Sequence, residues 1–222
     1  MIVLGLQVGM SLVWLLSNAD AKVTLANWFI ASPSQVFEDG KVWTLVTSPL
    51  LEIDFLALLL TALMLWMFVP TLERFWGTPR FFRFVVITSV VGTLAGCLMG
   101  LATGNMNVPV FGLSPFTYAS IVAFGIIYAR QPVQFFGVLP LTGRQLMLGF
   151  IAFLVLFIGL QGLWEKGASF AAAMGVAAIM TSKKWSPGLA LKRWRISRAR
   201  AKLTVLEGGA AKPKRDGERY LN

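Results

Sequence analysis

The residue types that most often carry out chemistry are scarce in this chain of 222 residues. It contains no histidine and a single cysteine, Cys97. Mechanisms that need an imidazole base or an imidazole metal ligand are therefore excluded, and one cysteine forms no bridge within the chain. No cluster of His, Cys, Asp or Glu has metal-ligand spacing, so we expect no metal site and no cofactor. Gly92, Gly96 and Gly100 recur at steps of four residues, which is typical of helix packing rather than of a phosphate-binding loop.

The composition is that of a membrane protein. Apolar types make up 56% of the residues and charged types 14%, against about 25% charged in an ordinary soluble domain. The mean hydropathy is +0.70. A water-soluble fold of this size could not bury that much apolar surface. A soluble enzyme, a disordered chain and a disulfide scaffold are therefore excluded.

Six apolar stretches are candidates for membrane-spanning helices, which need about 20 predominantly apolar residues. They predict an all-α membrane protein with a six-transmembrane-helix bundle over residues 1–182. The first stretch has no basic residues before it, so we favour a span over the alternative of a signal peptide. The stretches are Ile2–Ser17, Ile53–Thr71, Phe81–Ala102, Val110–Ala129, Leu146–Trp164 and Gly167–Thr181.

The basic residues indicate how the spans are oriented. Seventeen of the twenty Lys and Arg fall in segments that would share one side of the membrane, twelve of them after residue 182. The other three are Lys22, Lys41 and Lys166. Because cytoplasmic loops are rich in Lys and Arg, this asymmetry predicts a multi-pass protein with both termini in the cytoplasm, in a plasma or inner membrane.

Residues 183–222 form a separate basic cytoplasmic tail, expected to be partly disordered, which accounts for most of the net charge of +10. Because the tail follows a span directly, we expect it to contact anionic lipid of the inner leaflet, at about 1 kcal/mol per basic residue, and not nucleic acid. A plain stop-transfer anchor is the alternative. The residues expected to face lipid are Lys192, Arg193, Arg195, Arg198 and Arg200.

The connection between the first two spans, Asn18–Glu52, is long and aromatic. It includes Trp28, Phe29, Phe37 and Trp43, which a solvated linker would not carry. We therefore expect an amphipathic structure in the outer membrane interface, with aromatic rings at headgroup depth.

Four short motifs occur in order along the predicted spans. They are Trp43-Thr44-Leu45-Val46-Thr47-Ser48, Leu65-Trp66-Met67-Phe68 with Glu73 and Gly77 after it, Gly112-Leu113-Ser114, and Gly175 in the last span. With six spans and a long first outer loop, they resemble the rhomboid family of intramembrane proteases over about residues 40–182. The first resembles the family's Trp-Arg motif with threonine in place of arginine, and the second resembles the end of its second span. The third resembles the Gly-x-Ser of its nucleophile, and Gly175 resembles a glycine of its His-x-Gly motif.

The resemblance implies which positions would be catalytic, and most of the required residue types are missing there. In an active rhomboid, a serine of the fourth span is activated by a histidine of the sixth span. A histidine and an asparagine of the second span help to hold the oxyanion. The corresponding positions here are Ser114 for the serine, Ala173 or Ala172 for its base, Ala57 and Thr61 for the second-span histidine and asparagine, and Glu52 for a loop histidine.

The chemistry around Ser114 predicts that catalysis is lost. A serine hydroxyl needs a neighbouring base to become a nucleophile. The predicted spans carry no acid or lysine near Ser114, and Lys166 lies about seven residues before the expected base position, roughly 10 Å along a helix. Pro115 lacks the backbone N–H that would help to hold an oxyanion. We therefore expect Ser114 to be vestigial and to be a helix N-cap, with Pro115 at the first helical position.

We expect a proteolytically inactive rhomboid-like protein that binds transmembrane segments of client proteins, as the family's pseudoproteases do. Glu52 and Asp54 at the outer mouth, with Phe55 and Trp43, are the candidate client-binding residues, and for the two acids a solvated surface position is the alternative. Two other hypotheses stay open, a divergent active intramembrane serine endopeptidase that uses Ser114, and a small transporter subunit or membrane scaffold. The residues expected to pack the helices are Gly112, Ala119, Ala171 and Gly175.

Overall fold

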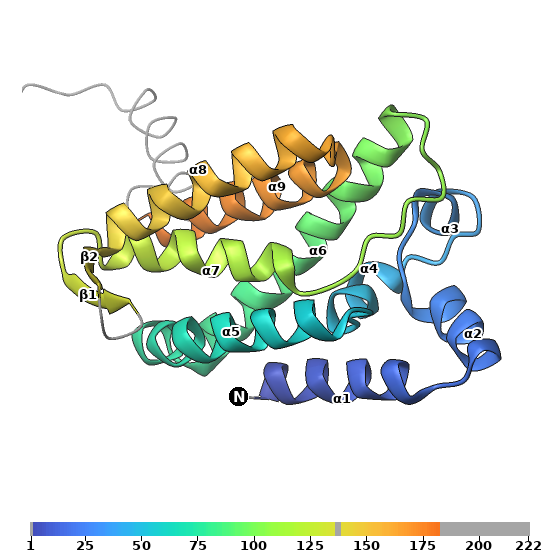
Figure 1. Cartoon of the computed structure of the whole chain (residues 1–222), viewed down its shortest axis with the longest axis horizontal. Coiled ribbons are helices and arrows are strands. Elements are labelled where there is room, and N and C mark those ends of the chain that lie inside the picture. Colours follow the sequence, from blue (N-terminus) through green and yellow to red (C-terminus); the bar gives the residue numbers. More distant parts are fainter. Residues whose placement is uncertain (1, 136–138, 183–222) are drawn as a thin grey trace, which may run out of the picture. The chain divides into compact units, whose positions relative to one another are not determined.

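The computed structural model describes residues 2–135 and 139–182, which are mostly helical (Figure 1). The lipid-facing basic residues predicted between Lys192 and Arg200 lie outside the described residues. The elements in chain order are α1 (Ile2–Leu16), α2 (Ala19–Phe29), α3 (Pro33–Phe37), α4 (Thr44–Thr47), the 3-10 helix η1 (Ser48–Leu50), α5 (Phe55–Trp76), α6 (Thr78–Ala102), α7 (Ser114–Ile127), β1 (Pro132–Phe135), β2 (Leu139–Thr142), α8 (Gly143–Gln161) and α9 (Trp164–Thr181).

Among the described residues, three helices are long and apolar enough to cross a membrane, namely α5, α6 and α8. The helices α1 and α7 are apolar but shorter, with 15 and 14 residues. The structure therefore supports three candidate spans and additional short apolar helices, whereas the sequence predicted six spans. The helix α7 is shorter than the predicted Val110–Ala129 because Val110 pairs with Ala31 in an antiparallel bridge and Gly112 has a φ of +86°.

The structure is mostly helical, and it contains one short hairpin that the sequence did not predict. Between α7 and α8 the chain forms a two-stranded antiparallel hairpin, in which Pro132 pairs with Thr142 and Phe135 with Leu139. Each strand is four residues long and contains a proline. The apolar and polar residues of so short a pair produce no alternating pattern that would distinguish it from a loop.

The core of the bundle is built around α7, which packs against α5, α6, α8 and α9. Figure 1 shows α7 between α5 on one side and α8 and α9 on the other. Aromatic side chains pack against one another in this core. The ring of Phe116 packs edge to face against Phe81 and Phe84, and Phe68 packs against Phe124 with ring centroids 5.2 Å apart.

The segment between α1 and α5 is folded rather than extended. It contains α2, α3, α4 and η1, and Ala31, Val36 and Leu45 pack with Cys97 of α6 in a second buried cluster. Its helix α2 buries none of its residues. An amphipathic structure was predicted here, and its depth in the membrane interface stays a prediction.

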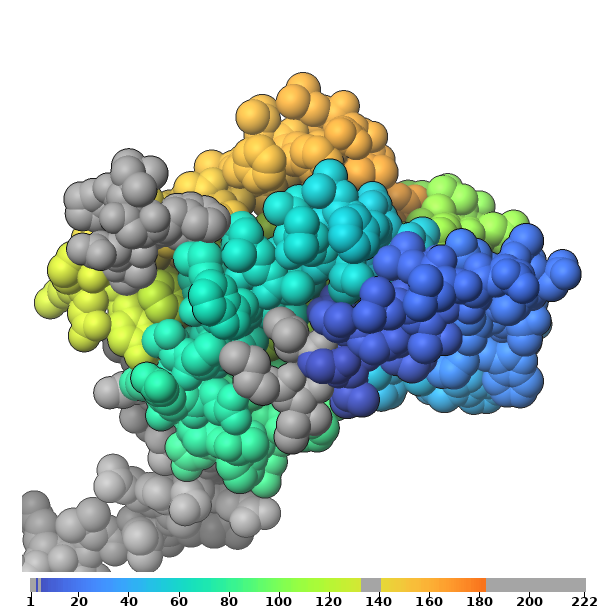
Figure 2. Space-filling view, turned by 60° about the horizontal axis from the view of Figure 1, so that its bottom comes forward, coloured from blue at the N-terminus to red at the C-terminus, as the bar shows by residue number. Residues whose placement is uncertain are grey.

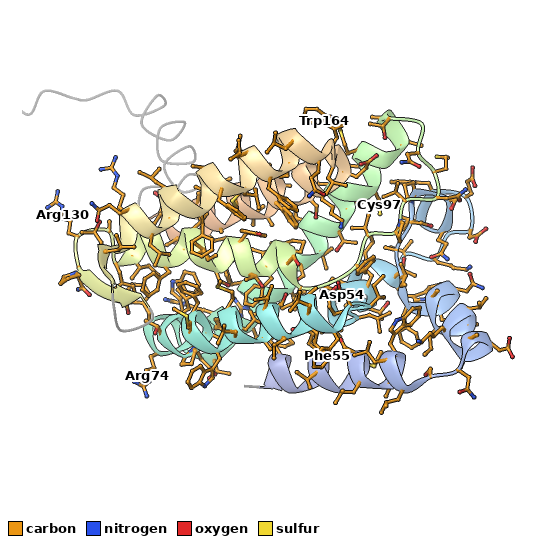
Figure 3. All side chains as sticks on the ribbon, in the orientation of Figure 1. Asp54, Phe55, Arg74, Cys97, Arg130 and Trp164 are labelled. Carbon is orange, nitrogen blue, oxygen red and sulfur yellow. The ribbon has the colours of Figure 1, made fainter. Side chains whose placement is uncertain are left out.

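The helices run back and forth between two ends of the bundle. Figure 3 shows Arg74 and Arg130 at one end, and Asp54 and Trp164 toward the opposite end. The N-termini of α5, α7 and α9 therefore lie at the end that carries α2, α3 and α4 (Figure 1). A site formed by the first residues of these three helices lies at that end.

Candidate functional site

A cavity of about 130 Å³ lies where the first residues of α5, α7 and α9 meet. Its wall includes Ala57 of α5, the loop before α7, Ser114 and Pro115 of α7, and the first two turns of α9. Most of the wall is apolar. The polar side chains that line it are those of Glu52, Ser114, Glu165, Lys166 and Ser169.

Ser114 is the first residue of α7 and is half-buried in the cavity wall. The residue before it, Leu113, is the N-cap, and no side chain caps this helix. The prediction that Ser114 is the N-cap and Pro115 the first helical residue is therefore wrong by one position. The shift arises because Leu113 already accepts the first helical hydrogen bond, from the backbone N–H of Thr117 at 2.9 Å. Within the described residues no side chain hydrogen-bonds to the Ser114 hydroxyl.

The position expected for a base is occupied by a packed methyl group. The side chain of Ala173 is 0% exposed, and α9 packs directly against both α6 and α7. A Cβ built on Gly92 would lie 2.7 Å from the Cβ of Pro115 and 3.4 Å from that of Ala173. The three helices therefore meet too closely for an imidazole. The oxyanion positions implied by the resemblance are Ala57, which lines the cavity, and Thr61, which is buried one turn further along α5.

Glu52 lies inside the protein and not at its outer surface, so the alternative of a solvated surface carboxylate is wrong, whereas its role in client binding stays a prediction. The residue is 4% exposed, and its backbone N–H donates to the Ser11 hydroxyl at 2.9 Å. One carboxylate oxygen lies so close to Gly112 that a Cβ at this position would collide with it. Two features therefore favour glycine at position 112, namely its φ of +86° and the close contact with Glu52.

The environment of Glu52 favours its protonated form. Burial raises the pKa of this carboxyl from 4.5 to about 7. The negative charge of Asp54 acts in the same direction, while the backbone N–H of Ile53 and the Lys166 ammonium act against it. Desolvation dominates because removing a carboxylate from water penalises the charged form. At neutral pH the cavity therefore holds a carboxyl that readily gains or loses a proton.

Ser169 is a cavity residue that the sequence did not single out. It is 2% exposed, lines the cavity, and its hydroxyl has no hydrogen-bond partner within the described residues. The sequence holds a signal for it, since Ser169, Ala173 and Ala177 recur at steps of four and are the buried residues of α9.

The same helical phase corrects two of the packing predictions. Ala171 and Gly175 are exposed, and a Cβ on Gly175 would meet nothing within 4 Å. They therefore lie on the opposite face of α9 from its packed residues. On α7 and the loop before it, Ala119 and Gly112 are buried. Small residues occur on several faces of α9, so their presence alone did not identify the packed face.

The rim of the cavity carries Glu165 and Lys166. The Glu165 carboxylate accepts a hydrogen bond from Thr103 Oγ1 at 3.0 Å, which ties α9 to the end of α6. Lys166 is exposed. The sequence placed Lys166 too far along α9 to reach Ser114, and in the structure both residues line the cavity without a hydrogen bond between them.

The remaining predicted client-binding residues lie outside the cavity. Asp54 caps α5, accepting a hydrogen bond from the Leu56 N–H at 2.9 Å. Phe55 follows it and is 63% exposed. Trp43 donates from Nε1 to the Trp28 carbonyl at 3.1 Å and stacks on its ring. Phe55 and Trp43 are therefore apolar surface residues, whereas Asp54 has a structural role in the helix start.

Within the described residues no group of three His, Cys, Asp or Glu could hold a metal ion.

Most of the sequence matches a known protein family. The family model of the eukaryotic integral membrane proteins DUF1751 matches residues 1–180. The chain belongs to this family of integral membrane proteins. No curated protein matches it.

Proposed function

We propose that this member of the integral membrane protein family DUF1751 is a rhomboid-like bundle that binds transmembrane segments of other proteins without cleaving them. The observation that carries the proposal is the packing of Ala173 between α6 and α7, at the place where a rhomboid protease would carry its base. The rhomboid-like fold is supported by the close packing of α7 on α9 and by Ser114 at the start of α7.

The absence of a strong nucleophile supports an inactive protein. A general base contributes about 10²–10⁴-fold to such reactions, and Ser114 has no base in hydrogen-bond contact within the described residues. The next residue, Pro115, supplies no N–H to an oxyanion. Loss of one oxyanion donor costs about 10²–10³-fold in well-studied hydrolases.

Client binding is supported by the outer sides of α5 and α8. Both helices pack on α7, but they do not pack extensively on each other. Figure 2 shows α5 in teal beside α1 in blue, with residues of α8 and α9 in orange above it. The large apolar side chains that α5 and α8 expose are Phe55, Leu56, Leu59, Leu60, Leu63, Trp66, Phe75, Leu148, Phe153, Val155, Leu156, Phe157 and Leu160.

The orientation in the membrane follows from the charges. Arg74 and Arg130 lie at one end of the bundle (Figure 3), and the positive-inside rule assigns this end to the cytoplasm. The cavity then faces the outer leaflet. A six-pass topology with both termini in the cytoplasm belongs to this proposal.

Site-specific photo-crosslinking tests client binding. A photoreactive residue replaces Phe55 on α5, and in a control variant it replaces Leu16, which is 82% exposed on α1. We expect membrane proteins to be crosslinked through their transmembrane segments from position 55 and not from position 16. Equal recovery from the two positions, or no recovery from position 55, would refute the proposal.

A second candidate function is favoured by one observation, the presence of Glu52 and Ser114 in the same cavity wall. A carboxylate with a pKa of about 7 has the basicity expected of a general base near neutral pH. The protein would then be a divergent serine endopeptidase. Cleavage of a transmembrane substrate that both Ser114→Ala and Glu52→Gln abolish would establish this function. Equal, negligible cleavage by the wild type and both variants would refute it.

A further inference from the structure

The Glu52 carboxylate is buried without a compensating cation. Within residues 2–135 and 139–182 no Lys or Arg forms an ion pair with it, and Lys166 acts on it only at longer range. An unpaired buried carboxylate is costly in a protein interior, more so than a neutral hydroxyl. The cavity beside Glu52 is therefore a place where a positive group would be stabilised.

Ser169 gives independent evidence for a ligand in this cavity. Its hydroxyl is buried and has no hydrogen-bond partner in the described part of the chain, although buried hydroxyls are normally hydrogen-bonded. The hydroxyl comes from α9, whereas Glu52 precedes α5 and Ser114 begins α7. Three oxygen-bearing side chains from three segments thus line one small cavity.

We propose that this cavity binds the ammonium group of a lysine in a client transmembrane segment, a proposal that rests on the proposed function. An ammonium has three N–H donors and no acceptor, which matches one carboxylate and two hydroxyl oxygens as acceptors. The apolar remainder of the wall, including Phe111 and Phe170, suits the methylene stem of a lysine. An anionic group would instead meet Glu52 and Glu165.

The cavity borders α5, the helix on which a client would lie. Ala57 of α5 lines it, and the neighbouring Phe55 and Leu56 of the same helix are exposed. A lysine side chain in lipid extends toward polar groups near the helix end. The cavity lies near the N-terminus of α5, so a lysine close to one end of a client segment has the right depth.

Lys166 is the competing ammonium of the protein itself. It lies on the rim of the same cavity, is exposed, and forms no ion pair with Glu52 in the described residues. Removing this charge by Lys166→Gln is expected to strengthen binding of a client lysine. The other charged groups near Glu52 are Asp54, at the start of α5, and Glu165 on the rim.

The binding is expected to depend on pH in a definite direction. Glu52 is ionised above a pH of about 7 and neutral below it. An ammonium ligand prefers the ionised form, so its affinity rises with pH through that value.

The experiment uses the full-length protein in lipid nanodiscs and three pairs of synthetic transmembrane peptides. The two peptides of a pair are identical except for one lysine or one methionine, and the pairs place this residue at three positions one residue apart near the outer end. Binding is measured at pH 8 and pH 5.5 for the wild type, Glu52→Gln, Ser169→Ala, Lys166→Gln and the control Glu38→Gln. Glu38 is an exposed acid of the outer segment, away from the cavity wall.

At pH 8 we expect the wild type to prefer the lysine peptide by about tenfold, the ratio typical of one charge-assisted hydrogen bond. The preference should fall toward unity at pH 5.5 and in Glu52→Gln, weaken in Ser169→Ala, rise in Lys166→Gln and persist in Glu38→Gln. Retained binding of the methionine peptide shows that each variant is folded. Equal binding of the two peptides by the wild type at pH 8 would overturn this inference while leaving the proposed function intact. Binding of neither peptide would overturn both.

Discussion

The helices α7 and α8 follow each other along the chain and are both strongly apolar, yet their surroundings differ. Ten of the 14 residues of α7 are buried. Only four of the 19 residues of α8 are buried, and large side chains such as Leu156 and Phe153 face outward. In a membrane protein, apolar side chains suit both lipid and protein, so hydropathy does not distinguish a central helix from a peripheral one.

The difference is carried by small and hydroxyl-bearing residues. On α7, Thr117 and Ser120 are buried, and their hydroxyls donate to the carbonyls of Leu113 and Phe116 at 3.1 and 2.9 Å. A Cβ on Gly125 would collide with Met147 of α8. Two of the glycines of α8, Gly149 and Gly159, face open space instead. Close packing and internally satisfied hydroxyls are therefore the marks of the central helix.

The largest effect is expected from truncating the core of α7. Phe116 is 0% exposed and packs against Phe81 and Phe84, so Phe116→Ala should lower the free energy of unfolding by about 3–5 kcal/mol. Leu156→Ala, at a position 61% exposed on α8, should change it by less than about 1 kcal/mol. Unfolding in mixed detergent micelles measures both. Similar losses in the two variants would mean that α8 is packed against something as closely as α7 is.

The next largest difference in the free energy of unfolding is expected between alanine variants of two glycines, one at an end of each helix. Gly112 before α7 and Gly162 after α8 have φ values of +86° and +65°, so alanine at either place should cost about 1–2 kcal/mol in backbone strain. Only at Gly112 does the new Cβ also meet the Glu52 carboxylate. Gly112→Ala should therefore lower the free energy of unfolding by about 3 kcal/mol in total. The same unfolding assay measures this change.

Gly162→Ala is the matched control for the backbone term, because its Cβ would meet nothing within 4 Å. The double variant Gly112→Ala with Glu52→Ala should recover part of the loss, since the colliding side chain is then gone. Equal losses for the two glycine variants would show that Glu52 does not press on Gly112.

Much of the fold follows from the sequence where apolar runs are long. The ranges of α5, α6 and α8 were predicted to within about five residues. Each apolar run is about as long as a membrane-spanning helix, so its two ends mark the ends of the helix. The span predicted from Val110 begins four residues before α7, because the bridge of Val110 to Ala31 is a contact between distant parts of the chain, whereas the helix start predicted at Ser114 and Pro115 was wrong by one residue only. The adjacency of α7 and α9 was expected from the resemblance to rhomboids.

The cavity could not be predicted in the same way. Glu52 stands at the edge of an apolar run, where a carboxylate is usually solvated, and its burial depends on α1 and on the loop before α7. Ser169 is one of many small residues in α9. Only the phase of the helix shows that it points inward with Ala173 and Ala177. Local sequence does not encode these long-range contacts.

The Glu52 carboxyl gives the start of α7 a pH dependence that α8 lacks. Its pKa is raised from 4.5 to about 7 in the folded protein, so the folded state binds the proton more tightly than the unfolded state. The contribution to stability is complete below pH 4.5 and is lost as the pH rises through about 7. Between pH 5 and pH 8 the free energy of unfolding should fall by about 2 kcal/mol.

Glu52→Gln should remove most of this slope, while the exposed control Glu38→Gln should keep it. The measurement is the unfolding free energy of the three proteins across the pH range in the same detergent. A wild-type stability that rises with pH over this range would contradict burial as the dominant influence on Glu52.

The smallest effects concern how each helix begins. The helix α8 starts with a capping box, in which the Thr142 hydroxyl accepts from the Gln145 N–H and the Gln145 side chain accepts from the Thr142 N–H at 3.0 Å. Thr142→Ala should therefore cost about 1 kcal/mol. The helix α7 has no side-chain cap, and Ser114 is already its first residue, so Ser114→Ala should leave the unfolding free energy almost unchanged. A loss in Ser114→Ala equal to that in Thr142→Ala would instead assign the serine a capping role. Unequal losses in the expected order would mean that tertiary packing holds the start of α7, while local hydrogen bonds hold the start of α8.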